Sequence, residues 1–204
     1  MSLTAYNKKR NFKQTSEPSG NENNQQDEKL SFVIQRHKAS RLHYDFRLEM
    51  DGVLKSWAVP KGPSLNPHDK RLAMMVEDHP YDYKDFSGEI PEGNYGAGIV
   101  EIWDSGTYTS LEDKGSAVED EKLLKAGLES GNLKFTLHGK KVKGEFALVR
   151  LKDSESNSWL LIKHRDSFAT DDPYNSEDHT SENSPINKWL AENKPGKKLS
   201  KKKS

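Results

Sequence analysis

The stretch Arg36–Leu48, with the sequence RHKASRLHYDFRL, alternates apolar and polar side chains from Leu42 onward. Successive side chains of a β-strand point to opposite faces. The apolar face of this strand would hold Leu42, Tyr44, Phe46 and Leu48, and the polar face His43, Asp45 and Arg47. The alternation predicts a half-buried strand that carries imidazole, carboxylate and guanidinium groups side by side.

Other short alternating segments surround this strand. They cover residues 31–35, 53–59, 71–76, 99–103, 133–137, 146–150 and 159–163. Turn signals separate them at Asp51-Gly52, Gly62-Pro63, Asp104-Ser105-Gly106 and His138-Gly139. This spacing favours an antiparallel barrel or sandwich over βαβ units, and we expect a mainly β fold, a compact antiparallel β-barrel.

One or two short helices should accompany the strands. Residues 119–128 are rich in helix formers and are followed by Gly131 as a stop signal. Ser184-Pro185 has the residue types of a helix N-terminus, and Ile186, Trp189 and Leu190 would form an apolar face behind it.

Composition divides the chain into three parts. Only 32% of the residues are hydrophobic, and few of them lie near the ends. Such polar segments cannot bury enough apolar surface to offset the entropy of ordering them. We expect a flexible N-terminal arm at residues 1–29, a barrel domain at 30–165 and a polar, lysine-rich tail at 166–204 that includes the second helix.

Charge and residue usage exclude several classes of protein. The 32 basic and 32 acidic residues cancel, which argues against a protein that coats DNA through bulk charge. A local basic cluster remains at Lys197–Lys203. The chain contains no cysteine, and no stretch resembles a signal peptide or a membrane span, so we expect a cytoplasmic protein with no membrane partner.

The polar face of the Leu42–Leu48 strand suggests phosphate chemistry. Imidazole and carboxylate groups are good ligands for a divalent metal such as manganese or zinc. His37 could fold back from a preceding loop as a third ligand beside His43 and Asp45, leaving open coordination positions for water or substrate. Arg47 could then hold a phosphate. The alternative is a solvent-facing row of cross-strand pairs without a ligand.

Two further segments add to this interpretation. His79 follows the strand at residues 71–76 and could donate a proton to a leaving oxygen or bind a phosphoryl oxygen, although it could also simply cap a turn before Pro80. The glycine-rich stretch at residues 88–98 lacks the Gly-Lys-Ser/Thr of a phosphate-binding loop and leads into a strand. We interpret it as a structural loop with unusual backbone angles.

Taken together, these segments resemble a known family. The motifs are Gln35-Arg36-His37, the Ser40–Leu48 strand, Trp57–Pro63, Val76–Pro80 and the Ile90–Gly98 loop. In this order they are similar to the 3′-phosphoesterase domain of bacterial and archaeal DNA ligase D. The resemblance runs from about residue 30 to residue 165, with weaker agreement in the N-terminal arm.

The resemblance implies an activity and a set of residue roles. Members form a compact β-barrel and use a divalent metal, typically manganese, with zinc or cobalt as alternatives here. They remove a 3′-terminal ribonucleoside and then the remaining 3′-phosphate to leave a 3′-hydroxyl. By similarity, His37, His43 and Asp45 would hold the metal, Arg47 and His79 would bind the scissile phosphate, and Tyr83 would assist. Positions of secondary importance match Gln35, Lys61, Arg71 and Glu77, and the N-terminal arm supplies Arg10, Asn11 and Glu17.

Asn11 departs from the family pattern, which has an acidic residue there, so one of the two activities could be weakened. The chain also lacks a Lys-x-Asp-Gly ligase motif. We therefore expect a free-standing enzyme that acts on primer-template 3′ ends of DNA. An ATP-dependent DNA ligase, a primase-polymerase and a Ku-like protein would be separate partners. The alternative is a barrel that binds DNA ends or a repair partner without catalysis.

Overall fold

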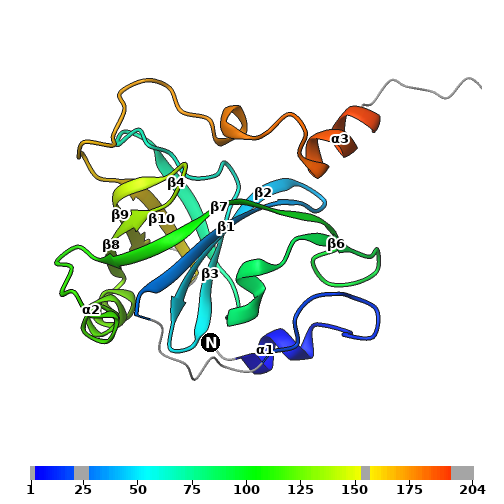
Figure 1. Ribbon diagram of the computed structural model, residues 1–204, viewed down its shortest axis with the longest axis horizontal. Coiled ribbons are helices and arrows are strands. Elements are labelled where there is room, and N and C mark those ends of the chain that lie inside the picture. Colours follow the sequence, from blue (N-terminus) through cyan, green and yellow to red (C-terminus); the bar gives the residue numbers. More distant parts are fainter. Residues whose placement is uncertain (1–2, 21–27, 153–156, 194–204) are drawn as a thin grey trace, which may run out of the picture.

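Antiparallel strands close into a barrel in the order β1-β2-β3-β4-β10-β9-β8-β7, and β7 pairs back to β1 (Figure 1). The computed structural model describes residues 3–20, 28–152 and 157–193. The barrel strands are β1 (Leu30–Lys38), β2 (Leu42–Met50), β3 (Val53–Val59), β4 (Lys70–Met75), β7 (Gly98–Ser110), β8 (Asn132–His138), β9 (Lys143–Arg150) and β10 (Ser158–Lys163). Each overlaps one predicted strand, so the predicted antiparallel barrel is confirmed.

Smaller elements join the barrel at its edges and ends. They are α1 (Leu3–Lys8), α2 (Ala117–Ser130), α3 (Pro185–Glu192), the 3₁₀ turns η1 (Tyr81–Asp85) and η2 (Ser176–His179), and the short strands β5 (His79–Pro80) and β6 (Gly88–Ile90). Both predicted helices are present, as α2 and α3. Gly131 ends α2 in the left-handed conformation at φ 76°, and the Ser184 side chain accepts a hydrogen bond from the Asn187 amide at the start of α3.

The predicted turn at Asp104-Ser105-Gly106 is wrong, because β7 runs through these residues. Between Asp104 and Ile102, β7 carries one extra residue opposite β1, which is a β-bulge. Asp104 uses its carboxylate to accept backbone hydrogen bonds from Lys140, Lys141 and Val142 in the neighbouring β8–β9 turn. Asp104, whose residue type suggested a turn at its own position, therefore stabilises the turn between β8 and β9.

Two apolar clusters lie on opposite faces of β1, β2 and β3. One fills the barrel, and it includes Phe32, Phe46 and Trp57. The other lies outside the barrel, between these strands and the segments of α1, η1 and β6, and it includes Tyr6, Leu54 and Tyr83. Because alternate residues of a strand face opposite sides, the outward-facing residues of β1 and β2 line the outer layer.

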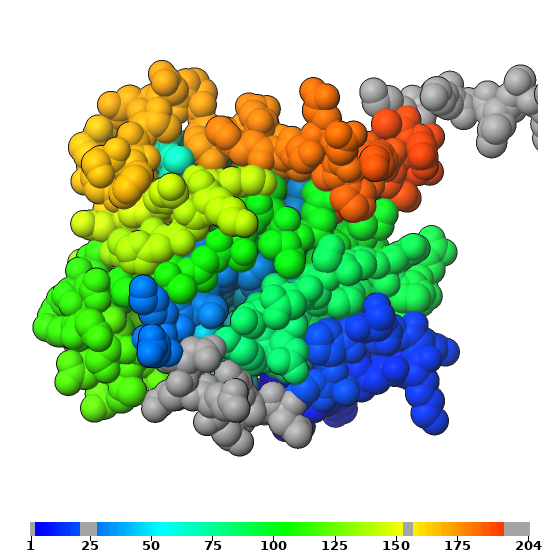
Figure 2. All heavy atoms as spheres, viewed as in Figure 1, coloured from blue at the N-terminus to red at the C-terminus, as the bar shows by residue number. Residues whose placement is uncertain are grey.

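The first described residues pack against the barrel rather than extending from it. Tyr6 of α1 is fully buried, and its hydroxyl donates to the Pro18 carbonyl, which closes residues 6–18 into a loop. In Figure 2 these dark blue residues lie against atoms coloured for residues 75–100. The composition of the N-terminal arm did not anticipate this placement, since only a few apolar side chains fix it.

The C-terminal segment crosses one end of the barrel, and α2 covers the other (Figure 1). Arg36, fully buried at the crossed end, donates to Glu177, Glu101 and Asn187. The lysine cluster predicted at Lys197–Lys203 lies outside the described residues. Among the described residues, we find no helix that is long and apolar enough to span a membrane.

Candidate active site

A cavity of about 220 Å³ opens on the outer face of β1, β2 and β3. Its floor is formed by side chains of these strands, and its walls by the N-terminal arm, by residues 76–83 and by the glycine-rich loop before β7. Among the residues with predicted roles, it is lined by Arg10, Glu17, His37, His43, Asp45, Arg47, Glu77, His79 and Tyr83.

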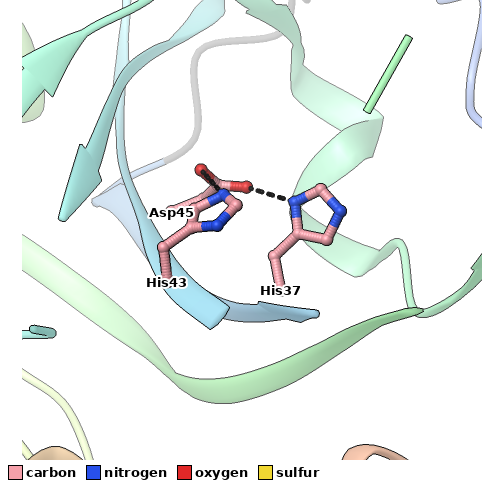
Figure 3. A group of neighbouring side chains, drawn as sticks. All are labelled: His37, His43 and Asp45. Carbon is pink, nitrogen blue, oxygen red and sulfur yellow. Dashed lines mark ion pairs between the residues drawn. The ribbon is translucent and has the colours of Figure 1, made fainter. Parts of the chain in front are cut away.

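His37, His43 and Asp45 form a tight group within this cavity (Figure 3). His37 lies on β1, not in a loop as the sequence suggested, and pairs directly with His43 on β2. His37 Nδ1 and His43 Nε2 each lie 3.5 Å from an oxygen of Asp45. The three ligand atoms lie within 4.8 Å of one another, so the group could hold a metal ion.

Backbone carbonyls determine which nitrogen each histidine offers. His37 Nε2 donates to the Gly96 carbonyl, and His43 Nδ1 donates to the Arg41 carbonyl, each at 2.9 Å. A neutral imidazole that donates from one nitrogen keeps a lone pair on the other. Both lone pairs therefore face Asp45, which is the arrangement that metal-ligating histidines require.

Asp45 is held as a carboxylate. Burial acts to raise the pKa of this carboxyl group, but the Arg47 guanidinium and the neighbouring His37 and His43 side chains outweigh it. The pKa of Asp45 therefore lies well below its ordinary value. A carboxylate that is ionised at all physiological pH values is suited to binding a cation.

Arg47 is fixed beside Asp45 by a complete set of side-chain contacts. Its Nε donates to Gln35 Oε1 at 2.7 Å, one terminal nitrogen to Ser56 at 2.9 Å and the other to Asp45 at 3.1 Å. The amide nitrogen of Gln35 in turn donates to the Tyr83 and Phe86 carbonyls. Gln35 therefore links the guanidinium to the η1 segment and sets its orientation.

His79 is buried in the cavity lining, on the short strand β5 that pairs with β3. Its Nδ1 donates to the Glu77 carbonyl at 2.9 Å, and its Nε2 lies 3.2 Å from a terminal nitrogen of Arg10. Burial, together with the positive charges of Arg47 and Arg10, holds the pKa of His79 well below its ordinary value. The imidazole is therefore neutral, with an acceptor nitrogen directed toward Arg10.

The N-terminal arm contributes a second guanidinium to the site. Arg10 donates to Glu17 at 2.9 Å and to Glu77 at 3.2 Å, and it lies 3.7 Å above the Tyr6 ring. Glu17 also accepts a hydrogen bond from the Tyr83 hydroxyl at 3.0 Å. The sequence predicted Arg10 and Glu17 as site residues, and the structure brings both into the cavity.

Four predicted residues are not part of the cavity lining: Gln35, which reaches the site only through Arg47, and Lys61, Arg71 and Asn11. Lys61 is exposed beyond the end of β3. Arg71 donates to Asp69 and to the Tyr174 carbonyl, so its contacts hold the C-terminal segment. Asn11 is exposed in a turn, where its side chain accepts from the Lys13 amide. The structure shows these placements, and their predicted roles remain predictions.

Sequence reasoning missed the contribution of the glycine-rich loop. Its residue types predict a structural loop, yet the Gly96 carbonyl orients His37 and Tyr95 lines the cavity. Ser56 and Tyr6, which hold Arg47 and Arg10, were also missed. A backbone carbonyl leaves no trace in residue type, whereas the Tyr95 ring beside three glycines was a signal that could have been used.

A closed antiparallel barrel with imidazole, carboxylate and guanidinium groups in one cavity has the residue types of a phosphoester hydrolase. Comparison with known proteins agrees. Residues 35–150 match the family model of the DNA ligase D 3′-phosphoesterase domain. This match covers more than half of the chain, and the chain belongs to that family. Membership implies a phosphoester hydrolase, and it confirms the family that the motifs suggested.

Several relatives are similar over most of this chain. The multifunctional non-homologous end joining protein LigD of Pseudomonas aeruginosa is 50% identical over 169 residues, which are 82% of this chain and 19% of that protein. LigD of Mycolicibacterium smegmatis is 43% identical over 80% of this chain and 21% of its own length. LigD of Mycobacterium tuberculosis is 42% identical over 78% of this chain and 19% of its own length. The chain therefore spans about a fifth of the length of these relatives.

Proposed function

We propose that this chain is a metal-dependent phosphoesterase that heals 3′ ends. Its substrates are DNA or RNA-tipped ends that carry a 3′-terminal ribonucleoside or a 3′-phosphate, and its product is a 3′-hydroxyl ready for repair and ligation. The observation that carries this proposal is the orientation of His37 and His43, whose free nitrogens meet at Asp45 beside the Arg47 guanidinium.

Manganese is the metal we propose, with zinc or cobalt as alternatives. Two imidazole nitrogens and one carboxylate suit any of these ions and leave coordination positions for a phosphoryl oxygen and water. When bound, such an ion supplies positive charge that polarises the phosphate and lowers the pKa of water. His37, His43 and Asp45 would hold it.

The phosphate would be held by protein groups that already face the cavity. The Arg47 guanidinium has five N–H groups. Three of them donate to Gln35, Ser56 and Asp45. Two N–H groups therefore remain for phosphate oxygens. Because these three hydrogen bonds already fix its side chain, Arg47 would lose little side-chain entropy on binding a phosphate.

His79 enters the reaction as a neutral imidazole, because its pKa lies well below its ordinary value. Its Nε2 is an acceptor in this state, opposite Arg10. A phosphate anion in the cavity would favour the protonated form, since an adjacent negative charge raises the pKa of an imidazole. His79 could then donate a hydrogen bond or a proton to an oxygen of the ester.

Tyr83 and the N-terminal arm would complete the site. Burial raises the pKa of Tyr83 well above its ordinary value, so its hydroxyl keeps its proton. This hydroxyl donates a hydrogen bond to Glu17. Since Glu17 also accepts from Arg10, the arm links Tyr83 to the Arg10 guanidinium.

The cellular setting is part of the proposal. The relatives are named as non-homologous end joining proteins, and they extend well beyond the region that this chain matches. We propose that the chain prepares ends for the same kind of repair. An ATP-dependent DNA ligase, a primase-polymerase and a Ku-like end-binding protein are the partners that such ends require.

The experiment is a labelled primer-template assay with either a 3′-phosphate or a single 3′-ribonucleotide, in manganese and in chelator. We expect manganese-dependent conversion to a 3′-hydroxyl. His43→Ala removes a ligand, so it should lower the rate by at least the roughly 10–100-fold that loss of an outer-shell partner of a metal costs. His79→Ala should lower it roughly 100-fold or more, as loss of an acid–base group does.

His68→Ala provides the matched control, because its side chain is 76% exposed and it lies outside the cavity lining. It should retain wild-type rates on both substrates. Absence of conversion by a folded, manganese-loaded wild-type protein would contradict the proposal. Tight binding of the same DNA ends without turnover would instead support the alternative of a non-catalytic end-binding barrel.

A further inference from the structure

Tyr95 is the residue of the cavity lining that presents a large apolar surface to solvent. It lies in the glycine-rich loop, next to Gly96, whose carbonyl orients His37. Its side chain is 48% exposed, whereas Tyr83 of the same lining is buried. Aromatic side chains lose apolar contact with protein when they are left open to water, so an exposed ring at the cavity calls for an explanation.

The position of this ring is fixed although it is exposed. Lys9 Nζ lies 4.6 Å from the ring centroid and 3.4 Å from the hydroxyl, and the Arg10 guanidinium lies 5.5 Å from the same centroid. The loop on either side depends on glycines with positive φ, at Gly93 and Gly96. A side chain at Gly98 would place its Cβ 2.1 Å from the Lys38 carbonyl oxygen, so the loop is also held close to β1.

The size of the cavity limits what can enter it. Its volume of about 220 Å³ is below the range of roughly 300–1,000 Å³ that is typical of pockets for drug-sized ligands. A phosphate group fits such a volume, but a phosphate together with an attached nucleoside does not. A nucleoside joined to a phosphate inside the cavity must therefore lie at the cavity mouth, where Tyr95 is exposed.

We propose that Tyr95 is a stacking platform for the base of the 3′-terminal nucleoside that leaves during diester cleavage. This inference rests on the proposed function and names the part of the substrate that the loop binds. Every base has a flat π-face, so an aromatic platform binds the terminal base without reading its identity.

The leaving nucleoside is the part of the substrate with most to gain from such a platform. It has no following base, so one face of its own base has no stacking partner within the strand. The bases upstream remain stacked on one another and paired with the template. A ring at the cavity mouth therefore adds a stacking partner to the leaving nucleoside and to little else.

The test compares two substrates that differ only beyond the scissile phosphate. One primer ends in a 3′-ribonucleotide and the other in a 3′-phosphate, and kcat/KM is measured for each in manganese. Tyr95→Leu removes the ring, and Tyr95→Phe keeps the ring but removes the hydroxyl that contacts Lys9. Phe168→Leu is the matched control, since Phe168 is 50% exposed and lies outside the cavity lining.

In Tyr95→Leu, the ratio of ribonucleotide to 3′-phosphate efficiency should fall roughly five- to 150-fold, the range for loss of one base–aromatic stack, mainly through KM. In Tyr95→Phe and Phe168→Leu the ratio should stay near the wild-type value. A terminal abasic ribose should abolish the difference between wild type and Tyr95→Leu, because it offers no base to stack.

An equal loss on both substrates in Tyr95→Leu would overturn the inference, and would mean that the ring only anchors the N-terminal arm through Lys9. If wild-type protein hydrolyses neither substrate, the proposed function itself fails. Binding of the uncleaved primers then decides the inference. The inference is supported if Tyr95→Leu binds the nucleoside-ended primer more weakly than wild type but binds the abasic primer equally well. It is contradicted if Tyr95→Leu and wild type bind the nucleoside-ended primer with the same affinity.

Discussion

His37 and His43 present different ring nitrogens to the same carboxylate, and the Gly96 and Arg41 carbonyls decide which nitrogen each presents. The two histidines face each other across adjacent strands, with ring centroids 4.8 Å apart. If both rings could rotate freely, each could present either nitrogen, and only one of these combinations would suit a metal. The two carbonyls instead hold each ring in one orientation, which would lower the entropy cost of binding the proposed metal.

His79 should make the metal-free protein less stable in acid. Its pKa in the folded protein lies well below the ordinary 6.5, so the unfolded chain takes up a proton near pH 6.5 while the folded protein does not. Stability from this group is therefore present above pH 6.5 and lost as the pH falls. His79→Gln should flatten the decline in unfolding free energy between pH 6 and 5 by up to about 1.4 kcal/mol per pH unit, measured by urea denaturation.

The exposed His68→Gln is the control for this experiment, and it should leave the slope as in wild type. A His79→Gln protein with the same pH dependence as wild type would show that the imidazole is not held neutral by its surroundings.

At the residue scale, sequence predicted well the groups that share one strand face. His43, Asp45 and Arg47 follow from alternation alone, and His79 from its place after a strand. The contributions that sequence could not predict come from the backbone or from distant segments, such as the Gly96 carbonyl and the Ser56 hydroxyl. The metal and the individual catalytic roles remain predictions.

Among the elements, the β1–β2 hairpin carries the largest share of the site. Its outward residues line the cavity, and its inward residues belong to the barrel interior. Alternation of apolar and polar residues predicted the barrel strands because each strand has one face toward the barrel interior and one toward the outside. It could not predict β5 and β6, which have two and three residues, or α1, which has six and lies in a polar segment.

Asp104 should be a strong determinant of the β8–β9 turn. Its buried carboxylate accepts from three backbone amides, and these would lose their acceptor in Asp104→Ala. We expect a loss of about 2–4 kcal/mol in unfolding free energy, measured by urea denaturation, since buried donors without partners are costly. Asp104→Asn keeps one carbonyl oxygen and should lose less. A change below about 0.5 kcal/mol in Asp104→Ala would show that the turn forms without this side chain.

At the scale of the whole molecule, the barrel lies between two chain segments that act on opposite faces of the same hairpin. The N-terminal arm brings Arg10 to the outer face, where the cavity lies. The C-terminal segment brings Glu177 to the inner face, where it accepts from Arg36 and from the Tyr44 hydroxyl. Composition could not reveal either contact, because a few buried side chains decide each one.

Glu177 should therefore affect both the stability of the fold and the proposed metal site. Arg36 pairs with Tyr44 across the strands, and His37 pairs with His43 at the next position. Glu177→Ala leaves the fully buried Arg36 short of an acceptor, and we expect a loss of roughly 1–3 kcal/mol in unfolding free energy, because Glu177 itself is partly exposed. The dissociation constant for manganese, measured by calorimetric titration, should rise as well.

Glu182→Ala tests the specificity of that effect, because Glu182 is an exposed residue on the same C-terminal segment. It should leave both quantities near wild type. A Glu177→Ala protein that is destabilised but binds manganese as tightly as wild type would show that the inner contact does not position the histidines.

We propose that His37, His43 and Asp45 bind the metal on which phosphoester hydrolysis depends. The most direct test is the release of phosphate from a 3′-phosphate primer by chelator-stripped protein as manganese is added back. Asp45→Asn is measured beside wild type, with the exposed Asp172→Asn as control. We predict no release before manganese is added and full recovery in wild type and Asp172→Asn. Asp45→Asn should lose at least the roughly 10–100-fold that loss of an outer-shell partner of a metal costs. Hydrolysis that persists in chelator, or recovers equally in Asp45→Asn, would contradict the claim.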